Sequence, residues 1–233
     1  MSECRYAVLF DLDGTLLDTL DDLADAVNFV IGNFGFASRS RDEVREFVGN
    51  GARKLVERAM YSKNGELDVE IEDTTLADEC FDEFRKYYSQ NLNNKTSPYN
   101  GLLHLMKRLA DRGIAMAVVS NKPDSATKSL CEAHFGGLLC AAIGDREGYR
   151  RKPHPDSIFE VLSDVGCERA VYVGDSEVDA LTARNAGLPS VLVTWGFRNK
   201  DFLKMNGAEV FADDCKELEE KIYTLLDIYD GEN

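Results

Sequence analysis

The stretch Ala7-Val8-Leu9-Phe10-Asp11-Leu12-Asp13-Gly14-Thr15 joins four apolar residues directly to two carboxylates, a glycine and a hydroxyl. The apolar part predicts a buried strand over residues 6–10, and the polar part predicts an acidic turn where that strand ends. Asp11 and Asp13 are two residues apart, so an extended backbone would point both side chains the same way. Two crowded carboxylates repel each other unless a cation lies between them, which indicates a metal site.

Three later segments also carry polar residues beside an apolar or helical pattern. They are Ser120-Asn121-Lys122 after the apolar run 115–119, Arg151-Lys152-Pro153 before a helical pattern, and Gly174-Asp175-Ser176-Glu177-Val178-Asp179 after the apolar run 170–173. In chain order they supply a hydroxyl, a lysine and further carboxylates. Polar residues of the kinds used in catalysis thus recur next to successive apolar or helical segments.

The apolar runs predict a doubly wound, parallel, Rossmann-like α/β sheet. Strands are expected at 6–10, 114–119, 139–143, 170–173 and 189–193, with a weaker one at 208–211. These runs lack polar alternation, which is typical of parallel strands buried on both faces. Helical patterns separate the later strands, as in alternating α/β folds. Because ligands bind at the carboxyl ends of such strands, the polar segments are expected to meet there.

About 100 residues separate the first two predicted strands, and this interval is helical in character. Four amphipathic patterns occur within it, at residues 23–31, 44–48, 55–60 and 80–88. They predict a helical bundle inserted as a domain of its own. We therefore expect a catalytic core formed by residues 1–17 and 96–233, and an inserted domain formed by residues 18–95.

The composition is that of a globular protein with an acidic surface. The chain has 233 residues, 44% of them hydrophobic, and a formal net charge of −15. This charge argues against binding to nucleic acid, which rests on Lys and Arg. No apolar run approaches the roughly 20 residues needed to cross a membrane. Six cysteines without a C-x-x-C pair are expected to be small buried side chains, and with no signal peptide they indicate a cytoplasmic location.

The four polar segments resemble, in this order, the motifs of the haloacid dehalogenase-like hydrolase superfamily. The resemblance covers Val8 to about Trp195 and points to the phosphoglycolate phosphatase-like branch. It implies a Mg²⁺-dependent phosphatase that hydrolyses a small phosphomonoester, 2-phosphoglycolate among the candidates, and that exists as a monomer or homodimer. It also implies that the inserted helical bundle is a mobile cap domain.

Residue roles follow from the same resemblance. Asp11 is the expected nucleophile, forming an aspartyl-phosphate, and Asp13 the expected general acid and base. The expected metal ligands are Asp11, the backbone carbonyl of Asp13, and Asp175. Asp179 is expected to act on these ligands without contacting the metal itself. Lys152 is expected to neutralise charge on the nucleophile and the phosphoryl group.

Substrate contacts are expected from both domains. In the core, Ser120, the N–H of Asn121 and the hydroxyl of Thr15 are the candidate hydrogen-bond donors. In the insertion, the segment 47–59 resembles the cap segment of phosphoglycolate phosphatases, and it places Gly51 and Arg53 where they could bind a carboxylate at a helix N-terminus.

Other functions remain open from the sequence. A β-phosphoglucomutase-like phosphosugar mutase or a phosphonatase would need an arginine or a lysine where Ala52 stands. A phospho-receiver signalling module combines the same residue types, but such modules carry no inserted helical bundle. A dehalogenase has no need of the acid–base function that Asp13 provides.

Overall fold

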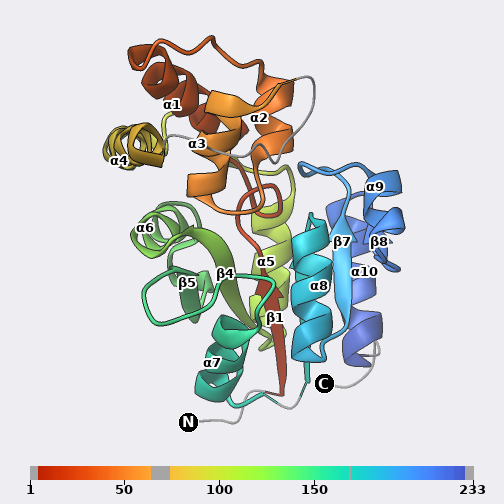
Figure 1. The fold of residues 1–233 in the computed structure, drawn as a ribbon. Coiled ribbons are helices and arrows are strands. Elements are labelled where there is room, and N and C mark those ends of the chain that lie inside the picture. The colour runs from red at the N-terminus through yellow and green to blue at the C-terminus, as the bar shows by residue number, and fades with distance from the viewer. Residues whose placement is uncertain (1–4, 64–73, 168, 229–233) are drawn as a thin grey trace. The chain divides into compact units, whose positions relative to one another are not determined.

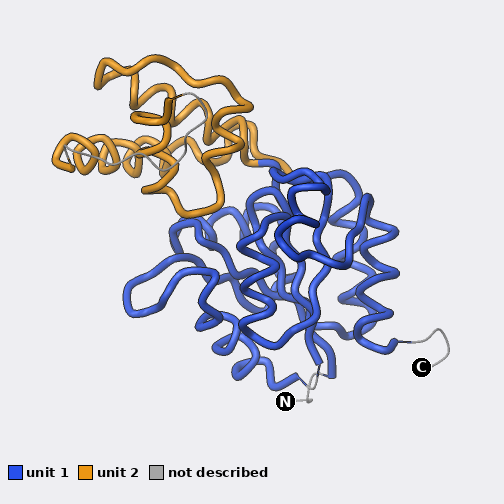
Figure 2. The backbone as a smooth tube through the Cα atoms, turned by 45° about the vertical axis from the view of Figure 1, so that its right-hand side comes forward, with its two compact units in different colours: residues 1–18, 98–233 blue, residues 19–97 orange. Residues whose placement is uncertain are grey.

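A computed structural model of the chain describes residues 5–63, 74–167 and 169–228. The chain divides into two compact units (Figure 2): unit 1 comprises residues 1–18 and 98–233, and unit 2 comprises residues 19–97. The expected insertion, 18–95, starts one residue before the first residue of unit 2 and stops two residues before its last residue.

Unit 1 is built on a six-stranded parallel sheet in the order β5-β4-β1-β6-β7-β8 (Figure 1). The strands are β1 (Tyr6–Phe10), β4 (Ala115–Pro123), β5 (Ala141–Asp145), β6 (Arg169–Gly174), β7 (Ser190–Val193) and β8 (Phe211–Ala212). Five of the predicted strands overlap observed ones over most of their length, whereas the one predicted at 208–211 meets β8 only at Phe211. The parallel α/β prediction is confirmed. β4 runs further than the predicted 114–119, because Asn121, Lys122 and Pro123 continue the extended backbone.

The strand order reverses at β1, which lies between β4 and β6. Val8, Leu9 and Phe10 expose none of their surface, as the unbroken apolar run requires. In register, Phe10 pairs with Val118 on one side and Val173 on the other. The residues that follow these three positions therefore emerge side by side, at the place where doubly wound sheets bind their ligands.

Helices cover both faces of this sheet. They are α5 (Leu102–Asp111), α6 (Asp124–Phe135), α7 (Asp156–Val165), α8 (Glu177–Ala186), α9 (Lys200–Met205) and α10 (Cys215–Leu226), with a short 3₁₀ helix, η1 (Gly136–Leu138). Ile158 of α7 and Ala183 of α8 pack on the face that carries Leu9 and Tyr172. Figure 1 shows α5 and α10 on the opposite face.

The regular structure of unit 2 consists of helices, apart from a bridge residue at position 63 and Ser97 of a two-residue strand. Its helices are α1 (Leu20–Asn33), α2 (Arg41–Phe47), α3 (Ala52–Tyr61) and α4 (Thr74–Asn91). Each coincides with one of the four predicted amphipathic patterns, and apolar residues from all four, such as Val27, Val44, Val56 and Phe84, are buried. Since the apolar stripes meet one another, the four segments form a bundle with its own core.

A two-stranded sheet, not predicted from the sequence, joins the segments that leave and re-enter unit 1. β2 (Leu17–Asp18) pairs with β3 (Ser97–Pro98). Next to it, the buried carboxylate of Asp22 accepts hydrogen bonds from the backbone N–H groups of Lys95 and Thr96 and from the Thr96 hydroxyl, at 2.8–3.0 Å. These contacts hold the start and the end of unit 2 together.

The prediction of buried cysteines is correct for Cys80 and Cys131 and wrong for Cys140, which is exposed, while Cys167 and Cys215 are only partly buried. Cys140 lies just before β5, after the apolar run has begun but where the backbone is still at the surface. Cys4 lies outside the described residues. Among the described helices, none combines the length and the apolar character needed to cross a membrane.

Candidate active site

The predicted nucleophile, Asp11, directly follows β1. Its backbone N–H donates to the carbonyl of Val173 in β6 at 2.8 Å, so the first residue beyond the strand is still held by the sheet. Asp11 is 8% exposed. Burial raises the pKa of Asp11 to about 7, against the opposing charge of Lys152, and the charge of Asp179 adds to the rise. The carboxylate is thus held in a buried place that favours a compensating cation.

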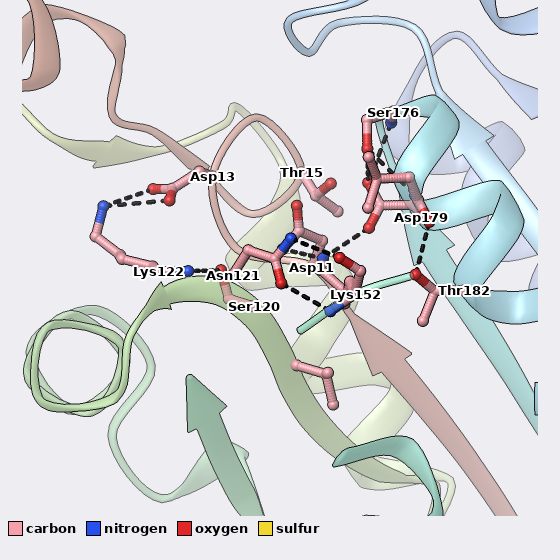
Figure 3. Close-up of polar contacts among 12 residues, drawn as sticks. Asp11, Asp13, Thr15, Ser120, Asn121, Lys122, Lys152, Ser176, Asp179 and Thr182 are labelled. Carbon is pink, nitrogen blue, oxygen red and sulfur yellow. Dashed lines mark hydrogen bonds and ion pairs between the residues drawn. The ribbon is translucent and has the colours of Figure 1, made fainter. Parts of the chain in front are cut away.

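Lys152 provides one such cation (Figure 3). Its Nζ lies 2.7 Å from Oδ1 of Asp11, 2.7 Å from Oδ1 of Asp179 and 3.1 Å from the hydroxyl of Tyr172. Burial by itself lowers the pKa of this lysine, but the charges of Asp11 and Asp179 raise it well above its ordinary value. Lys152 therefore stays charged and bridges two carboxylates.

A second pair of contacts fixes the segment that carries Lys152. The side-chain oxygen of Asn121 accepts from the backbone N–H of Lys152 at 2.9 Å, and the side-chain nitrogen donates to its carbonyl at 3.1 Å. A side-chain amide bound this way replaces a backbone partner. Asn121 consequently ties the lysine's loop to the end of β4.

Asp175 and Asp179 follow β6 and lie at the start of α8. Asp179 takes part in a capping box with Ser176, and its Oδ2 also accepts from the N–H of Asp175 at 3.2 Å. Asp175 itself accepts from the N–H of Phe197 at 2.7 Å and from the hydroxyl of Thr15 at 3.4 Å. The helix cap and the loop after β7 together fix both carboxylates.

Asp11, Asp175 and Asp179 form an acidic cluster in which one carboxylate oxygen from each lies within 4.8 Å of the others. All three side chains are buried. Burial raises the pKa of Asp175 well above its usual range, and the charges of Asp179 and Asp11 add to this rise. Hard oxygen donors that share uncompensated negative charge suit a hard cation such as Mg²⁺.

Asp13 does not share the direction of Asp11. β1 ends at Phe10, so the alternation expected of an extended strand does not reach residue 13. Its carboxylate contacts Nζ of Lys122 at 2.9 Å and 3.2 Å, and Figure 3 shows it turned toward that lysine and away from Asp179. The expectation that both side chains point the same way is therefore wrong, because a turn replaces the strand.

Comparison with known proteins identifies the family. Residues 8–193 match the family model described as haloacid dehalogenase-like hydrolase. The chain belongs to this family. A phosphoglycolate phosphatase of Mesorhizobium japonicum is 34% identical over 89% of this chain and 91% of its own length. One from Agrobacterium fabrum is 31% identical over 94% of this chain and 92% of its own length.

A solved structure agrees with these relatives. The Lactobacillus delbrueckii protein provisionally named phosphoglycolate phosphatase superposes with a TM-score of 0.89 at 36% identity, covering 95% of this chain and 99% of that one. The haloacid dehalogenase-like fold, a parallel sheet with an inserted helical domain, is thereby established here. The chain is an enzyme of this family, a phosphoric monoester hydrolase.

In unit 2 the two residues predicted to bind substrate lie at the start of α3. Gly51 precedes the helix with φ of 88°, a conformation that glycine adopts without strain. Arg53 is ion-paired with Glu57 at 2.5 Å and with Asp78. Arg58, further along α3, donates to the carbonyl of Phe47 at 3.0 Å and thereby shapes the turn that precedes the helix.

Several residues of this haloacid dehalogenase-like site were not predicted from the sequence. Tyr172 is fully buried and bonds Lys152 and Asp179; a tyrosine within an otherwise apolar strand was the available signal. Trp195 donates to the carbonyl of Thr15 at 3.2 Å, and Lys122 pairs with Asp13. The partners of Trp195 and Lys122 lie 180 and 109 residues away in the sequence, so spacing within the chain could not reveal these two residues.

Proposed function

We propose that the chain is a Mg²⁺-dependent phosphatase that forms an aspartyl-phosphate on Asp11. The observation that carries this proposal is the buried Asp11 carboxylate at the end of β1, with the Lys152 ammonium 2.7 Å away. A cation in contact with an attacking carboxylate also lies close to the phosphoryl oxygens during transfer. Because charge spreads over those oxygens in the transition state, a preorganised cation stabilises it.

In the first step a carboxylate oxygen of Asp11 forms a bond to phosphorus, and the bond from phosphorus to the substrate's oxygen breaks. The leaving oxygen takes a proton from Asp13. In the second step water attacks phosphorus and gives its proton to Asp13, and the bond to Asp11 breaks to release phosphate. The hydroxyl of Ser120 and the N–H of Asn121 donate hydrogen bonds to the phosphoryl oxygens.

The residues of the acidic cluster fit a magnesium ion. Asp11, the backbone carbonyl of Asp13, and Asp175 would hold it, with Asp179 supporting Asp175 through the helix cap. The raised pKa values of Asp11 and Asp175 support this assignment. Burial and neighbouring carboxylates disfavour the charged form of both groups, and a bound cation would stabilise that form. When bound, Mg²⁺ supplies positive charge to the phosphoryl group and to the nucleophile.

We propose 2-phosphoglycolate as the substrate, with unit 2 acting as the cap. The support is the name of the curated relatives together with the Gly51–Arg53 segment. A helix N-terminus and an arginine are suited to a substrate carboxylate. Arg53 already contacts Glu57 and Asp78, so substrate would have to share or replace one of these partners.

The mechanism is tested by trapping the intermediate. Substrate is mixed with the enzyme in Mg²⁺, the reaction is quenched in acid, and the phosphorylated peptide is found by mass spectrometry. We expect phosphate on the peptide that contains Asp11, more of it in Asp13→Asn, and neither phosphopeptide nor turnover in Asp11→Asn. Phosphate on Ser120, or an active Asp11→Asn variant, would overturn the proposal.

A further inference from the structure

Lys122 is a buried cation to which the proposed mechanism gives no role. Its side chain is 3% exposed, and its Nζ contacts both carboxylate oxygens of Asp13, at 2.9 Å and 3.2 Å. The Asp13 side chain is 15% exposed. An ammonium group buried away from water is costly unless it is paired with a negative charge. The Lys122 ammonium group is therefore held in contact with the Asp13 carboxylate. This pair links the end of β4 to the turn after β1.

The backbone of Lys122 is held from several sides. Its N–H donates to the hydroxyl of Ser120 at 3.2 Å, and its carbonyl accepts from the hydroxyl of Thr127 at 3.3 Å. Gly144 packs against the same carbonyl, where a Cβ would come within 2.5 Å of the oxygen. A register shift in β4 between Val119 and Pro123 accompanies this packing. The side chain therefore leaves a rigid position.

The backbone on the other side of the pair is also fixed. Asp13 forms an isolated β-bridge with Leu17, and the N–H of Gly14 donates to the carbonyl of Leu17 at 2.9 Å. With both backbones held, one ammonium group that contacts both oxygens defines how the carboxylate is turned (Figure 3).

We propose that Lys122 is a positioning residue that orients the Asp13 carboxylate for proton transfer. The inference rests on the proposed function, in which Asp13 protonates the leaving oxygen and then deprotonates water. Such transfers require the acid within about 2.6–3.2 Å of the reacting oxygen, so a freely rotating carboxylate loses rate. Lys122 acts through Asp13 and does not itself bind the phosphoryl group.

The test is a double-mutant cycle on the single-turnover rate of aspartyl-phosphate formation, measured by acid quench with two substrates, because the second step needs Asp13 whichever substrate is used. Lys122→Met and Lys122→Gln are made in the native chain and in Asp13→Asn, with Lys122→Arg as the conservative variant. An alkyl phosphate needs a protonated leaving group, whereas p-nitrophenyl phosphate needs one much less. Lys128→Met is the matched control, because Lys128 forms a surface pair with Asp124 at 2.6 Å and its side chain is 58% exposed.

Lys122→Met and Lys122→Gln should each lower the rate of aspartyl-phosphate formation from the alkyl phosphate by about 10–100-fold, within the range of acid–base help, and the rate from p-nitrophenyl phosphate should fall less. KM should stay within about threefold, because ground-state binding is untouched. In Asp13→Asn the same changes should alter the rate of aspartyl-phosphate formation less than about twofold, since residues that act as a unit are not additive. Lys122→Arg should recover most of the loss, and Lys128→Met should leave both constants unchanged.

The outcomes separate this inference from the function on which it rests. If formation of the aspartyl-phosphate in Asp13→Asn slows no more with the alkyl phosphate than with p-nitrophenyl phosphate, the proposed mechanism fails. If Asp13→Asn behaves as proposed but the loss from Lys122→Met persists in that background, or appears in KM, Lys122 contacts substrate directly and the inference alone fails. If Lys122→Met does not fold, the same comparison is made with Lys122→Gln. The double variants that contain Asp13→Asn have no carboxylate at residue 13, so the loss of the lysine leaves no unpaired charge there.

Discussion

Replacement of Lys152 by methionine should damage stability and catalysis together, for one electrostatic reason. The lysine's raised pKa keeps it charged, so the variant loses a full positive charge between Asp11 and Asp179, each 2.7 Å away. Removing one partner of a buried ion pair costs about 3–5 kcal/mol. Losing a preorganised electrostatic donor costs about 10²–10³-fold in kcat.

A second substitution separates the two effects. Asp179→Asn keeps one oxygen for the helix cap at Ser176 and places an amide group beside Tyr172, where it no longer repels Asp11. In Lys152→Met this removes one of the two unpaired charges. The double variant should therefore be more stable than the sum of the single changes by about 1–3 kcal/mol, a usual coupling between contacting residues. Its activity should remain low, because the cation is still missing.

The assay is urea denaturation followed by tryptophan fluorescence, with kcat/KM measured in parallel. The chain has a single tryptophan, and this residue, Trp195, lies in unit 1 with the site, so the signal reports the correct unit. Lys128→Met, which breaks an exposed pair, should cost about 0–1 kcal/mol. Additivity of Lys152→Met and Asp179→Asn within about 0.5 kcal/mol would refute the reasoning, as would a folded Lys152→Met with nearly full activity.

Three further predictions follow from the described contacts. Exhaustive EDTA treatment should abolish turnover, and Mg²⁺ should restore it; undiminished turnover without metal would remove the cation from the proposed mechanism. Arg53→Ala should raise KM for carboxylated substrates and spare p-nitrophenyl phosphate in steady-state assays, whereas equal losses on both would move Arg53 out of the substrate site. Asp22→Asn should lower the free energy of unfolding, followed by circular dichroism, by about 1–3 kcal/mol, because the buried N–H and hydroxyl of Thr96 lose a carboxylate acceptor. Asp25→Asn, on an exposed pair with Lys95 at 2.6 Å, should lower the free energy of unfolding much less than Asp22→Asn does; equal effects would contradict the importance of burial.

The sheet and the helical insertion were predictable because their signals are local. An unbroken apolar run such as residues 6–10 has few alternatives to a buried parallel strand, and the four amphipathic patterns at 23–88 need a common core. The order of polar segments at strand ends also predicted that Asp11 and Asp175 would meet, since parallel strands finish at one edge. The periodicity of apolar residues and the order of the polar segments along the chain are properties of nearby residues, so the sequence alone shows them.

The partner of each charged group was decided only by the tertiary structure. The sequence placed Asp13 beside Asp11, yet the chain turns after Phe10 and the ion pair of Asp13 is with Lys122. Likewise the sequence identified Lys152, while its contacts with Asp179 and Tyr172 depend on α8 and β6 packing around it. Water screens an exposed charge, so that charge interacts weakly with other residues. A buried charge requires a partner within about 4 Å, and the packing of the chain determines which residue lies that near.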